Sequence, residues 1–65
     1  MDQKFDTTIQ TIVTAIRRAG YDPYAQLTGF LRTQDERYIT RTDNARELAK
    51  GLDRVQLKQY VKRMK

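Results

Sequence analysis

The sequence contains no cysteine, no histidine and no tryptophan, and its 65 residues include one proline and three glycines. Without cysteine no disulfide framework can form, and without cysteine or histidine a zinc site lacks its usual ligands. The same absences remove the thiol nucleophile and the imidazole that most often serves as general base. The glycines stand apart along the chain, so a glycine-rich phosphate-binding loop is absent as well. We therefore expect a protein that is not an enzyme, with no catalytic residue, no metal site and no cofactor.

Long hydrophobic runs are also absent, and no segment is typical of a membrane span or a signal peptide. Hydrophobic residues make up 38% of the chain and charged residues 32%, which is ordinary for a folded cytoplasmic protein. The length fits a single domain over residues 1–65, and the core of such a domain is small. Since neither disulfides nor zinc can reinforce it, we expect very regular helix packing or association with a second copy, and we favour a homodimer.

Apolar residues at helical spacing predict a first helix over about residues 3–19. Asp2 is a suitable N-cap for this helix, and Gly20 is suited to end it in a left-handed conformation. A second helix is predicted to begin at Asp22 and Pro23, because aspartate is favoured at the N-cap and proline at the first helical position.

The middle and the end of the chain carry further signals of structure. Gly29 weakens the second helix unless another helix packs closely against it, and we expect such a contact. The aromatic and β-branched residues 38–40 predict a short extended segment or strand. Asn44 with Glu47 three residues later resembles a capping box for a third helix, and Asp53 is a suitable N-cap for a fourth.

These signals predict a mainly α fold, a small four-helix domain with a short extended or β segment between the second and third helices. Aromatic and apolar residues at helical spacing are expected in the core or in the seam of a dimer. The candidates for these positions are Leu27, Phe30, Tyr38, Leu57, Val61 and Met64.

The formal net charge of +5 lies entirely in residues 54–65, which contain five basic residues and no acidic one. Four of the basic residues share one face of the predicted last helix: Arg54, Lys58, Lys62 and Lys65. This stripe is typical of a solvated helix face, and it is also compatible with binding of nucleic acid, a membrane surface or an acidic partner. A second polar group, Arg41, Asn44 and Arg46, fits either loop fixation or recognition.

Two segments, one from Gly20 to Leu31 and the other over residues 35–46, together resemble the motifs of the IreB family of regulatory phosphoproteins. The stretch from Gly20 to Leu31 is similar to that family's GYNPxxQIVGYV, and residues 35–46 match D-x-x-Y-[VI]-x-R-x-x-N-A-R without a gap in between. The matching positions that we single out are Gly20, Tyr21, Pro23, Gln26, Gly29, Tyr38, Arg41, Asn44, Ala45 and Arg46.

The resemblance implies a small dimeric cytoplasmic protein of Gram-positive bacteria, mainly helical with short antiparallel strands. It further implies a substrate of a Ser/Thr kinase and its phosphatase, in signalling that controls the cell-envelope stress response and antibiotic resistance. The family's phosphorylated threonines precede the first helix, where this sequence has only Met1 and Asp2, so we assign no phosphoacceptor. The alternative hypothesis is a small basic nucleic-acid-binding regulator that uses the C-terminal helix, and a third is a structural subunit of a larger assembly.

Overall fold

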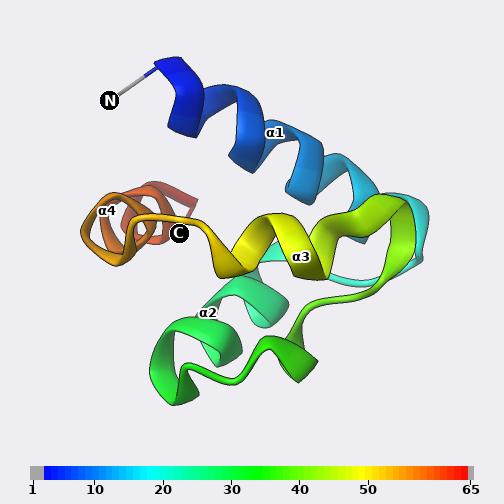
Figure 1. Ribbon diagram of the computed structural model, residues 1–65. Coiled ribbons are helices and arrows are strands. Elements are labelled where there is room, and N and C mark those ends of the chain that lie inside the picture. Colours follow the sequence, from blue (N-terminus) through cyan, green and yellow to red (C-terminus); the bar gives the residue numbers. More distant parts are fainter. Residues whose placement is uncertain (1–2, 65) are drawn as a thin grey trace.

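The computed structural model describes residues 3–64 and is built from helices (Figure 1). Four α-helices and two 3₁₀ turns follow one another: α1 (Gln3–Arg18), α2 (Pro23–Thr33), η1 (Glu36–Tyr38), η2 (Thr42–Asn44), α3 (Ala45–Lys50) and α4 (Arg54–Met64). The predicted mainly helical fold with four helices is confirmed. Within residues 3–64, no helix has the length and the apolar character needed to cross a membrane.

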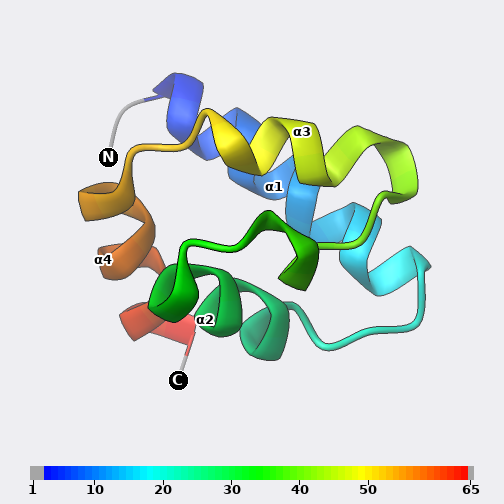
Figure 2. The same ribbon diagram turned by 60° about the horizontal axis from the view of Figure 1, so that its bottom comes forward.

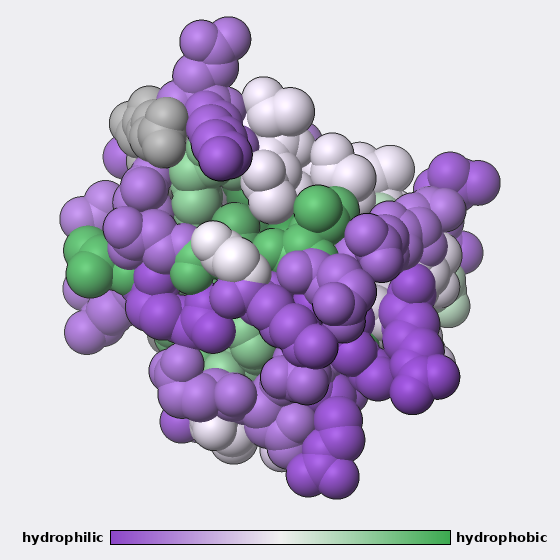
Figure 3. Space-filling model, viewed as in Figure 1, coloured by the Kyte–Doolittle hydropathy of each residue, from purple (hydrophilic) through white to green (hydrophobic). Residues whose placement is uncertain are grey.

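The helices pair in two sets around one core. α1 lies along α3 and also contacts η2, whereas α2 packs against α4 and η1 (Figures 1 and 2). The face seen in Figure 3 is mostly hydrophilic, with hydrophobic residues visible in small areas between the polar ones. The segment that links α2 to α3 contacts both sets through η1, which packs against α2 and α3 (Figure 2).

The apolar face of α1 contributes the largest share of the core, as its sequence pattern predicts. Its buried residues are Phe5, Ile9, Ile12, Val13, Ala15 and Ile16. The helix ends at Arg18, and Gly20 follows in the closing turn with a left-handed φ of 87°. The N–H of Tyr21 donates to the Ile16 carbonyl oxygen at 3.1 Å. This arrangement closes the last turn as expected for a terminal glycine. The predicted N-cap, Asp2, lies outside the described residues.

Two further helix starts agree with the sequence. Asp22 Oδ1 accepts the N–H of Tyr24 at 3.1 Å at the start of α2. Asp53 Oδ1 accepts the N–H of Val55 at 2.8 Å and that of Gln56 at 3.2 Å at the start of α4. These hydrogen bonds, first from Gln56 and then from Val55, favour the carboxylate and lower the pKa of Asp53. Both predicted N-caps are confirmed.

Most of the predicted core residues are buried. Leu27, Phe30, Leu57 and Val61 belong to the core, and Met64 packs against it while partly buried. Tyr38 is 49% exposed, so it does not belong to the core of the single chain, and its alternative place in the seam of a dimer stays a prediction. The physical reason is its position on η1, where the ring lies against α2 rather than between helices.

The extended segment predicted at residues 38–40 is not a strand, and residues 3–64 contain no strand. Asp35 accepts the N–H of Arg37 at 2.9 Å, and the N–H of Ile39 reaches the Glu36 carbonyl oxygen at 2.9 Å. These bonds fold residues 36–38 into the turn η1. Only then does Ile39 adopt extended angles, with φ −103° and ψ 132°, and its side chain is fully buried.

The capping box predicted for α3 is also wrong. The side chain of Asn44 makes no capping hydrogen bond, and Asp43 and Asn44 have φ values of 49° and 66°. Asparagine and aspartate tolerate this left-handed region better than most residues. Asn44 therefore serves the turn into α3 through its backbone conformation.

Gly29 does make a close contact, but with a side chain and not with a helix. A Cβ atom placed on Gly29 would lie 2.9 Å from Cε1 and 3.0 Å from Cγ of Tyr38, closer than van der Waals contact allows. The glycine thus leaves the space on α2 that the Tyr38 ring occupies, which is why a residue of low helix propensity stands in mid-helix.

This contact predicts opposite effects of one substitution in two backgrounds. In the wild-type chain, we expect Gly29→Ala to destabilise the fold by about 1 kcal/mol, because overpacking costs about 1–3 kcal/mol and better helix propensity returns only about 1 kcal/mol. In a Tyr38→Ala background the same change should stabilise by up to about 1 kcal/mol. Urea unfolding followed by circular dichroism measures both, and equal stabilisation in the two backgrounds would contradict the contact.

Candidate binding groove

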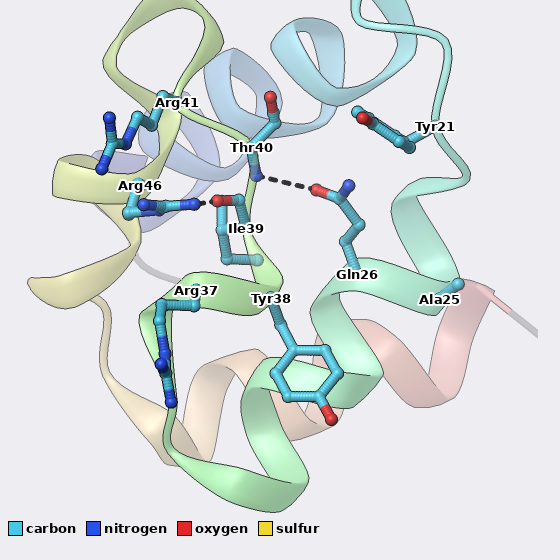
Figure 4. Close-up of a pocket in the computed structure, with 9 residues that line it drawn as sticks. All are labelled: Tyr21, Ala25, Gln26, Arg37, Tyr38, Ile39, Thr40, Arg41 and Arg46. Atoms are coloured by element: carbon cyan, nitrogen blue, oxygen red, sulfur yellow. Dashed lines mark hydrogen bonds between the residues drawn. The ribbon is translucent and has the colours of Figure 1, made fainter.

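An open groove of about 660 Å³ lies between α2 and the segment that links it to α3 (Figure 4). Its lining residues come from the start of α2, from residues 37–41 and from α3: Tyr21, Ala25, Gln26, Arg37, Tyr38, Ile39, Thr40, Arg41 and Arg46. Five of the motif residues singled out from the sequence are among them, namely Tyr21, Gln26, Tyr38, Arg41 and Arg46. The two motif segments, separate in sequence, therefore meet at one surface.

Two side chains hold the middle of the groove by binding backbone groups. Gln26 Oε1 accepts the N–H of Thr40 at 3.0 Å, and Arg46 Nε donates to the carbonyl oxygen of Ile39 at 2.9 Å. The two bonds approach the segment from opposite sides (Figure 4). Because buried or partly buried backbone groups need hydrogen-bond partners, these contacts replace those that a neighbouring strand would supply. Arg46 thus makes the contact expected of loop fixation, one of the two roles predicted for it, and the recognition role stays a prediction.

Arg37 is held at the groove by Asp35. Arg37 Nη2 lies 2.8 Å from Asp35 Oδ2, and Arg37 Nε lies 3.1 Å from each carboxylate oxygen. The side-chain hydrogen bonds from Arg37, followed by that from its backbone N–H, lower the pKa of Asp35. The same pair raises the pKa of Arg37. The guanidinium is fixed in direction and its charge is partly balanced.

Arg41 differs from the other two arginines of the groove. Its side chain is exposed, and its guanidinium has no hydrogen bond or ion pair with residues 3–64. Figure 4 shows Arg41 and Arg46 on the same side of the groove. Arg41 therefore retains its full set of hydrogen-bond donors, which suit a carboxylate or a phosphate.

Two tyrosines provide aromatic surface at the other side of the groove. Tyr21 is 57% exposed and Tyr38 49% exposed, and Figure 4 shows the Tyr38 ring over α2 and Tyr21 beside the chain that leads into α2. Exposed tyrosines combine a rigid apolar ring with a hydroxyl group, a combination enriched at protein interfaces. The nine lining residues include no carboxylate. The groove is thus suited to bind an acidic or polar segment.

The remaining motif residues support the scaffold. Pro23 is buried at the first position of α2, and Ala45 is buried at the start of α3. Gly20 and Asn44 adopt left-handed backbone conformations in the turns, and Gly29 makes room for Tyr38. Half of the motif therefore builds the frame that positions the other half.

The sequence did not identify Arg37, Ala25, Ile39 and Thr40 as groove residues. One sequence feature could have indicated the position of Arg37, namely the aspartate two residues earlier. Such an aspartate can both cap a turn and bind the guanidinium. Ile39 and Thr40 line the groove through long-range contacts, which local patterns do not reveal.

The residues of the basic stripe predicted on the last helix differ in their surroundings, because Arg54 contacts other residues of the chain whereas Lys58 and Lys62 are exposed. The Arg54 guanidinium carbon lies 4.5 Å from the centre of the Phe30 ring, while Nη1 donates to the Leu52 carbonyl oxygen at 2.8 Å. Its Nε donates to Gln34 Oε1 at 2.8 Å, so Arg54 joins the ends of α2 and α3 to the start of α4. Lys58 and Lys62 are exposed, and Lys65 lies outside the described residues. Anion binding by this stripe stays a prediction.

Comparison with known protein families gives one finding. The family model described as IreB regulatory phosphoprotein matches residues 1–64 of this chain. The match includes both motif segments and all of the groove.

The pair of Asp35 and Arg37 predicts a dependence of stability on pH. The folded pKa of Asp35 is lowered from 3.8, so its contribution to stability is present above about pH 3.8 and is lost as the pH falls through the folded value. We expect Asp35→Asn to be less stable than wild type at neutral pH, with a difference that shrinks in acid. Urea unfolding midpoints between pH 7 and pH 2 measure this.

Arg37, which pairs with Asp35, provides the control for this experiment. Arg37→Ala removes the main cause of the lowered pKa, so adding it to Asp35→Asn should change the pH dependence little further. A difference between wild type and Asp35→Asn that stays constant down to pH 2 would contradict the assignment.

Proposed function

Because this chain belongs to the IreB family of regulatory phosphoproteins, we propose that it is a cytoplasmic, non-enzymatic regulator that acts through protein–protein contacts. We further propose that it is a substrate of a Ser/Thr kinase and phosphatase pair in cell-envelope stress and antibiotic-resistance signalling. The observation that carries the proposal is the meeting of both family motifs at the groove, where they present arginine and tyrosine side chains.

The features of the groove favour binding of a protein over a catalytic function. Gln26 and Arg46 fix the backbone of residues 39–40, so the surface is preorganised before a partner arrives. Arg41 adds donors that no group of residues 3–64 satisfies, and Tyr21 and Tyr38 add aromatic area. Arginine and tyrosine are the residue types that most often carry the binding energy of an interface.

The alternative of nucleic-acid binding by the last helix has less to support it. The first of its cations, Arg54, is engaged with Phe30, Leu52 and Gln34 within the chain. A phosphate-binding surface depends on several free cations in one place, and the stripe loses one of them to these contacts.

We also propose that the protein forms a homodimer, since a core of this size gains stability from a second copy. We expect sedimentation velocity at micromolar concentrations to show a dimer whose population is unchanged between low and high salt. A well-folded monomer at high micromolar concentration would contradict this part of the proposal.

The regulatory role predicts a loss of function without a loss of folding. Arg41→Ala removes a side chain that has no partner within residues 3–64, so we expect an unchanged melting temperature. In a strain that lacks the gene, the variant should fail to restore survival on a cell-wall antibiotic, whereas wild type restores it. Graded antibiotic concentrations, with protein levels checked by immunoblot, measure the effect.

Arg17→Ala is the matched control, because Arg17 is exposed and does not line the groove. It should restore survival as wild type does. In a separate measurement, the kinase domain of the same organism should phosphorylate the purified wild-type chain. Full function of Arg41→Ala would reject the role of the groove, and absence of phosphorylation would reject the place in kinase signalling.

A further inference from the structure

A second groove lies between α2 and α4 and shares no lining residue with the binding groove described above. Its volume is about 440 Å³, and it is lined by Thr28, Leu31, Arg32, Arg54, Val55 and Lys58. We call it the α2–α4 groove. Two of its residues are aliphatic, Leu31, which is half-buried, and Val55, which is 67% exposed. Val55 is the most exposed large hydrophobic residue of the described chain.

The position of Val55 makes its exposure notable. It lies in the first turn of α4, which contains no acidic residue, although a carboxylate would be favourable at a helix N-terminus. The side chain also contributes nothing to the core. An apolar residue at this place is therefore explained by neither helix stability nor core packing.

Cations border the aliphatic surface on both helices. Arg32 stands on α2 and Lys58 on α4, both exposed, and neither forms an ion pair with any residue from 3 to 64. Lys62 continues the line of charge one turn further along α4. None of the residues that line the groove is acidic. The groove thus presents an apolar strip between unbalanced positive charges.

We propose that the α2–α4 groove binds an amphipathic helix of a partner protein, one whose apolar face is flanked by aspartate or glutamate. Leucine-like residues at i, i+3, i+4 and i+7 of such a helix would cover Leu31 and Val55. Its carboxylates would lie beside Arg32 and Lys58, so that the potentials of the two surfaces are complementary.

The charges also decide between this partner and two other occupants. A second copy placed on the same face by a twofold axis would bring both sets of Arg32 and Lys58 together, and like charges at an interface are unfavourable. A proposed homodimer would accordingly use another face. Nucleic acid would satisfy the cations but leave Val55 and Leu31 without an apolar partner.

The test uses a synthetic amphipathic helical peptide with leucines at i, i+3, i+4 and i+7 and glutamates on both sides. Two peptides serve as comparison, one with the same composition and scrambled leucines, the other with lysines in place of the glutamates. We expect the glutamate peptide alone to bind, with amide chemical-shift changes at Leu31, Val55 and Lys58. Fluorescence anisotropy gives the dissociation constants.

Variants of the protein sharpen the test. The double variant Arg32→Glu, Lys58→Glu should bind the glutamate peptide about tenfold more weakly or worse, and it should gain binding to the lysine peptide. Val55→Asp should also weaken binding, and it is expected to fold because the residue is exposed and a carboxylate suits the helix start. Arg63→Glu, a change at an exposed residue of α4 that does not line the groove, should bind as wild type does.

Three results would overturn the proposal. Equal affinity of wild type and the double variant would remove the role of the cations, and shift changes at Tyr38 and Arg41 would move binding to the other groove. A homodimer that Val55→Asp dissociates would make a second copy the occupant. Since the two grooves share no residue, failure here is distinguishable from failure of the function proposed for Arg41.

Discussion

The complete burial of Ile39 is the constraint on which the arrangement of α2, α3 and the binding groove depends. The side chain of Ile39 enters the core from a segment that has no neighbouring strand within residues 3–64, so the partly buried backbone groups beside it need other partners. Gln26 from α2 and Arg46 from α3 supply them through the Thr40 N–H and the Ile39 carbonyl oxygen. The hydrogen bonds to the backbone at and beside this buried residue thus connect α2 and α3 to the segment between them, and the same segment lines the groove.

The motif residues divide accordingly into those that build this frame and those that are left to bind. Arg46 belongs to the frame through its Nε atom, whereas the guanidinium of Arg41, five residues earlier, makes no hydrogen bond or ion pair with residues 3–64. Tyr38 lies between the two classes, because one side of its ring contacts Gly29 and about half of the residue remains exposed. A side chain without a partner in residues 3–64, held in place by neighbours that make structural contacts, is the arrangement expected of a recognition surface.

The sequence predicted those features that depend on local signals. The face of α1, the stop at Gly20 and the caps Asp22 and Asp53 follow from spacing and from residue preferences within a few positions. Five of the ten motif residues singled out from the sequence line the groove, but the sequence predicted neither the groove nor what each residue does there. The roles of Gln26 and Arg54 rest on bonds that span 14 and 20 residues, and no local pattern encodes such contacts.

The errors have the same origin. Residues 38–40 have the composition of a strand, yet Asp35 folds the preceding residues into a turn and side chains satisfy the backbone that follows. Asn44 has the spacing of a capping box, but its backbone is left-handed and its side chain makes no capping hydrogen bond. In both places the backbone conformation of a turn outweighed a single local pattern.

The helix α2 forms part of both grooves, and its packing bears on whether they act together. Ala25 and Gln26 line the first groove, and Leu31 and Arg32 line the second. Between them Leu27 and Phe30 are fully or almost fully buried, and the Arg54 guanidinium covers the Phe30 ring. Coupling between sites requires an element with two arrangements that each ligand favours differently. The structure shows α2 held in one arrangement, so we expect occupation of either groove to leave the affinity of the other unchanged. A partner that engages both grooves would then gain only from being held in place by the first contact.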